Sequence, residues 1–220
     1  MNPGPKTPNL KIDIVSDVVC PWCIIGYKQL LKALESMSGQ FNAEIEWHPF
    51  ELNPYMPPEG QDLREHVIQK YGTTPEQSKA ARARMTELGT ELGFTFAYAD
   101  DMRMVNTFSA HQLLHWARTM QKQTELKLEL FAAFFTQRED VSDFTVLSAA
   151  AARAGLSEKE ALAVLQDGRY AELVREELDT WLDNGVHAVP TFFFNKKFQV
   201  PGAQEAETFV RVLERIKASE

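Results

Sequence analysis

Cys20 and Cys23 are the only cysteines in this 220-residue chain, and they lie in the segment Cys-Pro-Trp-Cys. Two thiols at this spacing on a helix start face the same side and are close enough to form a disulfide. The loop that this disulfide would close is very short. The disulfide would therefore remove little entropy from the unfolded chain and contribute little to stability. The spacing therefore indicates redox chemistry rather than a structural crosslink.

The chemistry open to this pair is thiol–disulfide exchange, in which one thiolate attacks a substrate disulfide and the second thiol releases the mixed disulfide. Free N–H groups at a helix start stabilise a thiolate. We therefore expect Cys20 to attack the substrate and Cys23 to release it. Pro21 fixes the first helical turn. Trp22 could offer substrates an apolar surface or could simply be a half-exposed ring. Asp17 is a candidate carboxylate near the pair.

Zinc binding is the alternative use of the two cysteines. It needs two further ligands, and His111 and His115 have helical i, i+4 spacing. Zinc motifs with two cysteines and two histidines usually separate the pairs by about 12–15 residues, and the gap here is far longer. We therefore predict no metal site, and we expect these histidines to lie on an ordinary helix face.

The elements that must position the cysteines follow from residue patterns. Residues 11–19 are short and rich in β-branched side chains, which predicts a strand that ends at Cys20. A helical period follows from Pro21 to a stop at Gly39, and residues 43–50 predict a second strand. The prolines and glycine of residues 51–60 indicate a loop and a domain boundary.

Helical patterns occupy most of residues 61–184, with start signals at Thr74 and Ser157. Strand character returns at Val-Pro-Thr-Phe-Phe-Phe, followed by a turn at 195–197, another short strand and an amphipathic helix over 204–217. The order is β-α-β, a helical block, then β-β-α. We therefore predict an α/β protein with one sheet interrupted by a helical insertion.

Composition excludes several classes of function. The chain is 44% hydrophobic and 25% charged, as in ordinary globular proteins, and its net charge is −8. Without a basic cluster we expect no nucleic-acid partner, and without a long apolar run we expect no membrane span. The proline-rich N-terminus lacks the apolar core of a secretory signal, so we expect a cytoplasmic protein.

Five segments in a fixed order resemble the DsbA-like branch of the thioredoxin superfamily, and within it the FrnE-type proteins. The segments are C-P-W-C-I-I-G (20–26), F-E-L-N-P-Y-M-P-P-E-G (50–60), V-N-T-F-S-A-H (105–111), H-A-V-P-T-F (187–192) and G-A-Q (202–204). The resemblance implies a thioredoxin fold with an all-helical insertion. It divides the chain into a flexible tail (1–9), a first half (10–59), the insertion (60–166) and a second half (167–220).

The resemblance also implies roles for individual residues. Cys20 would be the nucleophile and Cys23 the resolving cysteine, with Pro190 as the family's cis-proline. The backbone of Val189 would then face an extended substrate, and Gly202 would leave room for it.

Other positions in the shared segments are weaker candidates. Asn53, Asn106 and His111 could bind substrate in a cleft or could tie the insertion to the sheet. His187 could tune the thiolate or could be a loop histidine facing solvent.

The chain departs from DsbA at Trp22, where DsbA has a histidine that helps to make it a strong oxidant, so we expect a less oxidising pair.

The expected activity is a protein-disulfide oxidoreductase or isomerase acting on protein or peptide thiols and disulfides, with no bound cofactor and with glutathione as a conceivable co-substrate. The alternatives are a glutathione-dependent isomerase or transferase of a small molecule and a non-catalytic zinc module. Relatives of the glutathione-dependent kind commonly have serine at the nucleophile position, whereas both cysteines are present here.

Overall fold

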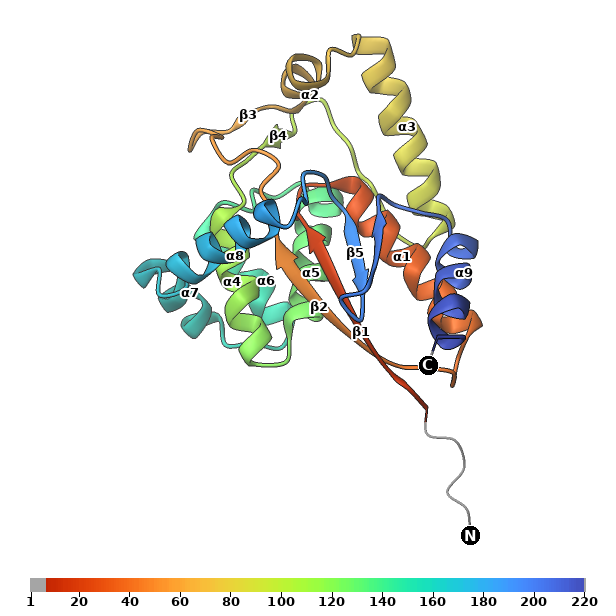
Figure 1. The fold of residues 1–220 in the computed structure, drawn as a ribbon. Coiled ribbons are helices and arrows are strands. Elements are labelled where there is room, and N and C mark those ends of the chain that lie inside the picture. The colour runs from red at the N-terminus through yellow and green to blue at the C-terminus, as the bar shows by residue number, and fades with distance from the viewer. Residues whose placement is uncertain (1–6, 220) are drawn as a thin grey trace.

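A computed structural model describes residues 7–219, and its centre is a four-stranded mixed sheet in the order β2-β1-β5-β6 (Figure 1). β1 (Asn9–Ser16) is parallel to β2 (Asn42–Pro49) and antiparallel to β5 (Thr191–Phe194). β6 (Phe198–Pro201) completes the sheet as a hairpin with β5. Strands from both ends of the chain share one sheet, which confirms the predicted α/β architecture.

The two faces of the sheet bury different kinds of side chain. Ile12 pairs with Phe194 and Ile14 with Phe192, and both phenylalanine rings contact Phe209 of α9 (Ala206–Lys217). The alternate positions of the strands point to the opposite face. That face carries polar groups, the buried carboxylate of Asp13 among them.

Helices cover both faces, as Figure 1 shows. α1 (Pro21–Ser36) packs beside α9 on the apolar face. α8 (Ala171–Asp183) covers the other face, where the Trp181 ring lies 5.1 Å from the Phe193 ring at a tilted angle. The start of α1 is therefore held between the end of β1 and the hairpin β5–β6, and this arrangement positions the cysteines.

The insertion between β2 and α8 is mainly helical, and its α5 contacts β2. Its helices are α2 (Leu63–Tyr71), α3 (Pro75–Glu91), α4 (Phe108–Thr119), α5 (Gln123–Ala132), the π-helix η1 (Ala133–Gln137), α6 (Phe144–Arg153) and α7 (Glu158–Asp167). It also contains a two-stranded antiparallel sheet of β3 (Gln61–Asp62) and β4 (Arg103–Met104). The insertion is therefore not all-helical, as the sequence had predicted. Strands of two residues leave no alternating pattern in the sequence, so these two could not be predicted.

The two predicted helix starts are present. At Thr74 the hydroxyl accepts the N–H of Gln77, whose side chain accepts the N–H of Thr74, a complete capping box. The hydroxyl of Ser157 accepts the N–H of Glu160. The Glu160 carboxylate accepts from Arg169 rather than from the N–H of Ser157.

Two predicted boundaries differ from the structure. β1 ends at Ser16 rather than Cys20, because the chain turns there and the N–H of Cys20 donates to the carbonyl of Asp17. The tail expected over residues 1–9 falls largely on residues 1–6, which lie outside the described residues, and Asn9 already belongs to β1.

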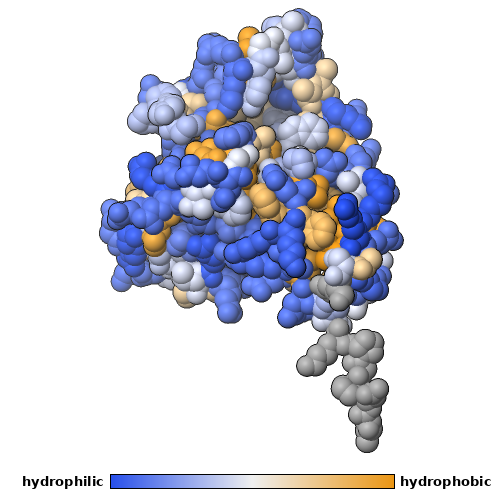
Figure 2. Space-filling model, in the orientation of Figure 1, coloured by the Kyte–Doolittle hydropathy of each residue, from blue (hydrophilic) through white to orange (hydrophobic). Residues whose placement is uncertain are grey.

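The surface in Figure 2 is mainly hydrophilic, with its hydrophobic groups in separate small patches. None of the helices in the described part of the chain is long and apolar enough to cross a membrane.

Candidate active site

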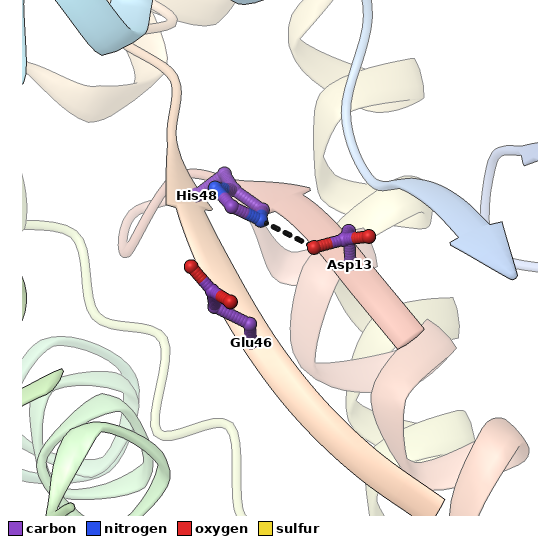
Figure 3. Close-up of side chains that lie close together, drawn as sticks. All are labelled: Asp13, Glu46 and His48. Atoms are coloured by element: carbon purple, nitrogen blue, oxygen red, sulfur yellow. Dashed lines mark hydrogen bonds and ion pairs between the residues drawn. The ribbon is translucent and has the colours of Figure 1, made fainter. Parts of the chain in front are cut away.

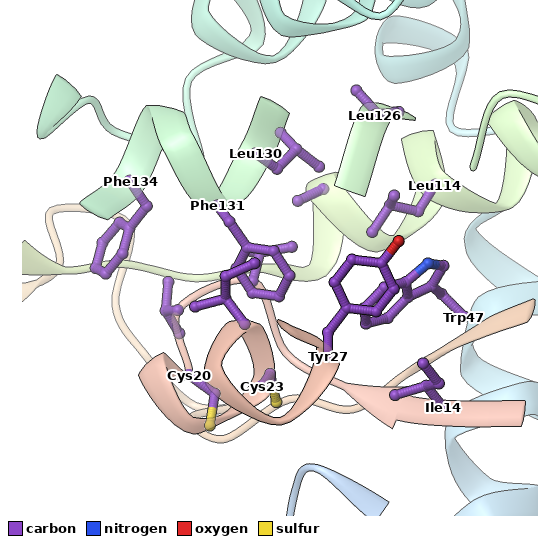
Figure 4. Close-up of a cluster of buried hydrophobic side chains, with 14 of the residues drawn as sticks. Ile14, Cys20, Cys23, Tyr27, Trp47, Leu114, Leu126, Leu130, Phe131 and Phe134 are labelled. Atoms are coloured by element: carbon purple, nitrogen blue, oxygen red, sulfur yellow. The ribbon is translucent and has the colours of Figure 1, made fainter. Parts of the chain in front are cut away.

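The two cysteines occupy the first turn of α1. Cys20 is the N-cap, with an extended backbone, and Pro21 is the first helical residue. The N–H of Cys23 donates to the carbonyl of Cys20 at 3.1 Å. Both are free thiols, Cys20 4% exposed and Cys23 fully buried. Figure 4 shows both sulfur atoms at the start of α1, beside the cluster formed by Tyr27, Trp47 and the α5 side chains.

The loop before β5 faces Cys20. The peptide bond between Val189 and Pro190 is cis, and the Cys20 thiol donates to the carbonyl of Val189 at 3.7 Å. The N–H of Gly202, which has a φ of +77°, donates to the carbonyl of Pro190 at 2.8 Å. A Cβ on Gly26 would lie 3.2 Å from the Pro190 ring, so this glycine permits the close approach of α1 and the loop.

Three of the residues that the sequence offered as substrate-binding candidates make contacts within the protein. His111 is buried and its Nε2 lies 3.0 Å from the carbonyl of Phe50, which joins α4 to the loop after β2. The Asn53 side chain accepts from Lys70 at 2.7 Å, and that of Asn106 accepts the N–H of Phe108 at the start of α4.

The other two candidates beside the cysteines are exposed. Trp22 is 42% exposed next to the pair, and His187 lies on the surface of the loop before Val189.

Asp17, at the turn before Cys20, is fully buried. Its Oδ2 accepts the N–H of Leu52 at 2.8 Å, and its Oδ1 lies 3.4 Å from Nε2 of His111. Burial alone would raise the pKa of this carboxyl, but the nearby His111 side chain and the N–H of Leu52 lower it. Burial, reinforced by repulsion from Asp17, raises the pKa of the neighbouring Glu51 to about 7.

Lys127 of α5 is fully buried. Its Nζ lies 3.4 Å from the carbonyl of Ser16 and over the rings of Trp47 and Phe131, at 5.3 and 5.2 Å from their centroids. Burial lowers its pKa to about 8. The sequence reasoning missed this residue, although its position four residues before Phe131 on the apolar face of the helix was a usable signal.

The two thiols behave as one coupled pair. The hydrogen bond to Cys23, followed by burial, raises the pKa of Cys20 well above its usual range. Burial also acts to raise the pKa of Cys23, but the neighbouring Cys20 thiol, the Ser16 hydroxyl and the charge of Lys127 lower it. The charge of Lys127 favours a thiolate at Cys23, whereas the helix start favours one at Cys20. The sequence showed the helix start, but not the groups that folding brings to Cys23.

A second polar cluster lies under α8, on the polar face of the sheet. Nε2 of His48 is 2.8 Å from Oδ1 of Asp13, and its Nδ1 is 2.6 Å from Oε1 of Glu177 (Figure 3 shows the first contact). Because both ring nitrogens face carboxylate oxygens, both donate when the ring is protonated. Burial lowers the pKa of His48, but these hydrogen bonds outweigh it and raise the pKa.

Within residues 7–219, Asp13, Glu46 and His48 form the one group of three ligand-type side chains close enough to share a metal ion. Lys11 and Arg118 already bind the two oxygens of Glu46, at 2.7 and 2.8 Å, and two cations there disfavour a third. The group does not include the cysteines. Within residues 7–219, no group of this kind joins Cys20 and Cys23 to His111 and His115.

A family model of the DSBA-like thioredoxin domain matches residues 11–214 of the chain. The chain belongs to this family. This is a family of DsbA-like thiol–disulfide oxidoreductases, and a cysteine pair at a helix start agrees with it.

Three known proteins are similar to this DSBA-like chain. The probable DsbA oxidoreductase SCO1869 of Streptomyces coelicolor is 29% identical, with a TM-score of 0.89 over 96% of this chain and 91% of that one. The uncharacterized protein YwbO of Bacillus subtilis is 27% identical over 203 residues, 92% of this chain and 94% of YwbO. The cytosolic disulfide reductase DsbM of Pseudomonas aeruginosa shares the fold, with a TM-score of 0.63, 15% identity, and coverage of 96% of this chain and 100% of DsbM. DsbM has also been solved with GSH.

Proposed function

We propose that the chain is a FrnE-type thiol–disulfide oxidoreductase that acts on protein or peptide disulfides through Cys20 and Cys23. The observation that carries this proposal is the pair of free thiols at the first turn of α1, with Cys20 hydrogen-bonded to the carbonyl of Val189. A family of oxidoreductases with this fold supports it.

The proposed reaction begins at Cys20, the less buried sulfur. Cys20 releases its proton to solvent, and its thiolate attacks one sulfur of the substrate disulfide. The substrate's second sulfur leaves as a thiolate, and a mixed disulfide joins Cys20 to the substrate. Cys23 then attacks Cys20, which forms the internal disulfide and releases the second substrate thiolate. The substrate gains two electrons, and the enzyme pair loses them.

The surroundings of Cys20 suit an extended peptide. An extended substrate that hydrogen-bonds to the backbone of Val189 would displace the Cys20 thiol from the carbonyl of Val189. It would then lie as an added strand beside the loop before β5. The exposed ring of Trp22 would contact apolar side chains of the substrate. Gly202, bonded to the carbonyl of Pro190, presents no side chain at the other end of this loop.

We infer a reductase or isomerase direction in the cytoplasm, with glutathione as the electron donor or co-substrate. A cytoplasmic glutathione pool keeps such a pair largely reduced. The likeness in fold to DsbM, a cytosolic disulfide reductase, supports this choice.

The test is an equilibrium titration of the purified protein in glutathione redox buffers, with free thiols counted by mass after alkylation. We expect both thiols to be lost together as one internal disulfide, with a midpoint nearer thioredoxin, about −270 mV, than DsbA, about −120 mV. Cys23→Ala should accumulate mixed disulfides with a peptide substrate, and the matched variant Cys20→Ala should accumulate none.

Three other results would oppose the proposal. Thiols that never form an internal disulfide would exclude a dithiol mechanism. Undiminished turnover of a small molecule by Cys23→Ala would favour the glutathione-dependent isomerase or transferase. Stoichiometric zinc in the purified protein would favour the binding module.

A further inference from the structure

His48 of β2 joins three elements of the fold. Its ring lies between two carboxylates, 2.8 Å from Oδ1 of Asp13 on β1 and 2.6 Å from Oε1 of Glu177 on α8. The ring of Trp181, one turn further along α8, lies 4.7 Å from the His48 ring. Asp13 and His48 are both buried. One buried ring therefore holds two side chains of α8 against the sheet.

Trp181 also sets the end of α8. Its ring lies 5.1 Å from the ring of Phe193 on β5. The carbonyl of Trp181 accepts the N–H of Val186, and the carbonyl of Leu182 accepts the N–H of Gly185. With Gly185 at a φ of +79°, these bonds form a Schellman motif, in which the helix ends in one defined direction. Val186 is buried, so the exit of the chain from α8 is anchored on both counts.

The chain that leaves α8 is the loop that faces Cys20. Val189 follows Val186 after two residues, and its carbonyl accepts from the Cys20 thiol at 3.7 Å. Figure 1 shows this loop beside the start of α1. At the other end of the loop, the Thr191 hydroxyl donates to the carbonyl of Ala188 at 2.8 Å. The position of the Val189 backbone therefore depends on two anchors, β5 on one side and α8 on the other.

We propose that His48 is a positioning residue for the exchange reaction: by holding α8 on the sheet, it keeps the backbone of Val189 where an extended peptide would bind beside Cys20. The proposal rests on the proposed function and names a determinant of its preference for peptides. His48 acts through α8 rather than by contact with the substrate. Its effect therefore falls on substrates that pair with the backbone of Val189, and not on the reactivity of the Cys20 thiol itself.

The protonation state of His48 decides how firmly it holds α8. A protonated ring donates from both nitrogens, so Asp13 and Glu177 each receive a hydrogen bond. A neutral ring has one N–H and one lone pair, so one of the two carboxylates then faces the lone pair. Folding raises the pKa of His48, because its hydrogen bonds to the two carboxylates outweigh burial. The hold on α8 therefore weakens as the pH rises through that pKa.

Other charged and titratable groups face His48 or its two carboxylate partners and belong to the same pH response. They are Lys11 on β1, Glu46 on β2, His115 and Arg118 on α4, and Lys196 in the turn between β5 and β6, with His111 and Lys127 across a small cavity. Arg118 and His115 lie 3.2 and 3.3 Å from the Glu177 carboxylate. Glu177 therefore keeps partners when the ring is neutral, and α8 loosens rather than detaches.

The experiment compares two disulfide probes that have the same leaving group. Thionitrobenzoate is linked to mercaptoethanol in the small probe and to the cysteine of a short extended peptide in the other. In both, the Cys20 thiolate bonds to the aliphatic sulfur and displaces the coloured thionitrobenzoate, but only the peptide has a backbone that can pair with Val189. The ratio of the two second-order rate constants, peptide over small probe, is the peptide preference. Ionisation of Cys20 cancels in this ratio, because both probes depend on it equally.

His48→Gln should lower the peptide preference about tenfold, the scale of one lost backbone hydrogen bond, and leave the reaction with the small probe within about twofold. In the wild type, the peptide preference should fall as the pH rises through the pKa of His48, which NMR of the ring protons measures. The variant has no ring to titrate, so its preference should be independent of pH. Leu173→Ala changes an exposed side chain of the same helix and provides the control that should behave as wild type.

Glu177→Gln is a second test that keeps the size of the side chain. Its amide can donate to the lone pair of a neutral ring, so His48 stays bonded on both sides at every pH. The peptide preference of this variant should therefore lose its dependence on pH. This result does not require the His48→Gln variant to fold.

Thermal unfolding at each pH establishes which variants are folded. A folded His48→Gln with the wild-type peptide preference would overturn the proposal, and so would a Glu177→Gln variant with the wild-type pH dependence. A wild-type preference that stays constant across the measured pKa of His48 would overturn it as well. A wild type that releases thionitrobenzoate from neither probe, or that prefers neither, would instead refute the proposed function, which keeps the two failures distinct.

Discussion

Replacing Lys127 with methionine should make the protein more stable at neutral pH. Burial lowers the pKa of the amine from 10.5 to about 8, which corresponds to about 3 kcal/mol of unfavourable free energy for the buried ammonium. Methionine has a similar length and no charge, so it removes this penalty while still filling the space beside Trp47 and Phe131. The lost cation–π contacts, worth about 1–2 kcal/mol, offset part of the gain. We expect a net stabilisation of about 1–2 kcal/mol at pH 7.

This gain should disappear at high pH. Below about pH 8 the folded and unfolded chains both hold the proton, so the wild type bears the full penalty. Between about pH 8 and 10.5 the unfolded chain still holds the proton but the folded chain has released it, and wild-type stability rises through this window. Above pH 10.5 both are neutral, and no penalty remains.

The assay is urea unfolding of wild type and Lys127→Met, both kept reduced, at pH 6.5, 8 and 10. Comparison at each pH cancels the titration of tyrosines and other groups shared by the two proteins. A melting temperature about 2–8 °C higher for the variant at pH 6.5 is the corresponding thermal result. A variant that is destabilised equally at all three pH values would refute the burial argument, since loss of packing alone has no pH dependence.

Two further changes test other parts of the site. His48→Gln removes the ring between Asp13 and Glu177 and should destabilise the protein by about 3 kcal/mol at pH 5.5. Because folding raises the pKa of His48, the contribution of its charge is complete below the unfolded value of 6.5 and is lost as the pH rises through the folded value. The difference between variant and wild type in thermal melts should therefore shrink as the pH rises, and parallel curves would contradict this. Gly26→Ala places a Cβ 3.2 Å from the Pro190 ring, and we expect a cost of about 1–3 kcal/mol together with exchange about tenfold slower or more. Exchange at the wild-type rate would show that the loop tolerates displacement.

Local signals predicted much of the fold. The capping box at Thr74 depends on residues within one turn, and the hairpin at 195–197 on adjacent residues, so both were readable in the sequence. The cysteine pair at the start of α1 was equally local. The approach of Val189 and Pro190 to Cys20 came from the family resemblance, because nothing in their own residue types places them there.

The groups around the cysteines could not be predicted in the same way. Lys127 reaches Ser16 across 111 residues of sequence, and His48 reaches Glu177 across 129. A buried lysine and a buried imidazole between carboxylates resemble surface residues until the neighbouring elements are known. Long-range packing therefore decided the electrostatics of the site.

The central strand β1 has consequences for synthesis of the chain. It pairs with β2 on one side and β5 on the other, and the N–H of Lys11 bonds to Asn195, 184 residues away. A ribosome adding about 5–20 residues per second needs roughly 7–30 s to proceed from β2 to β5. During that interval β1 has an unpaired hydrogen-bonding edge, which can pair with another nascent chain. Insertion of a long helical segment between the halves of the sheet thus lengthens the time in which the growing polypeptide depends on chaperones.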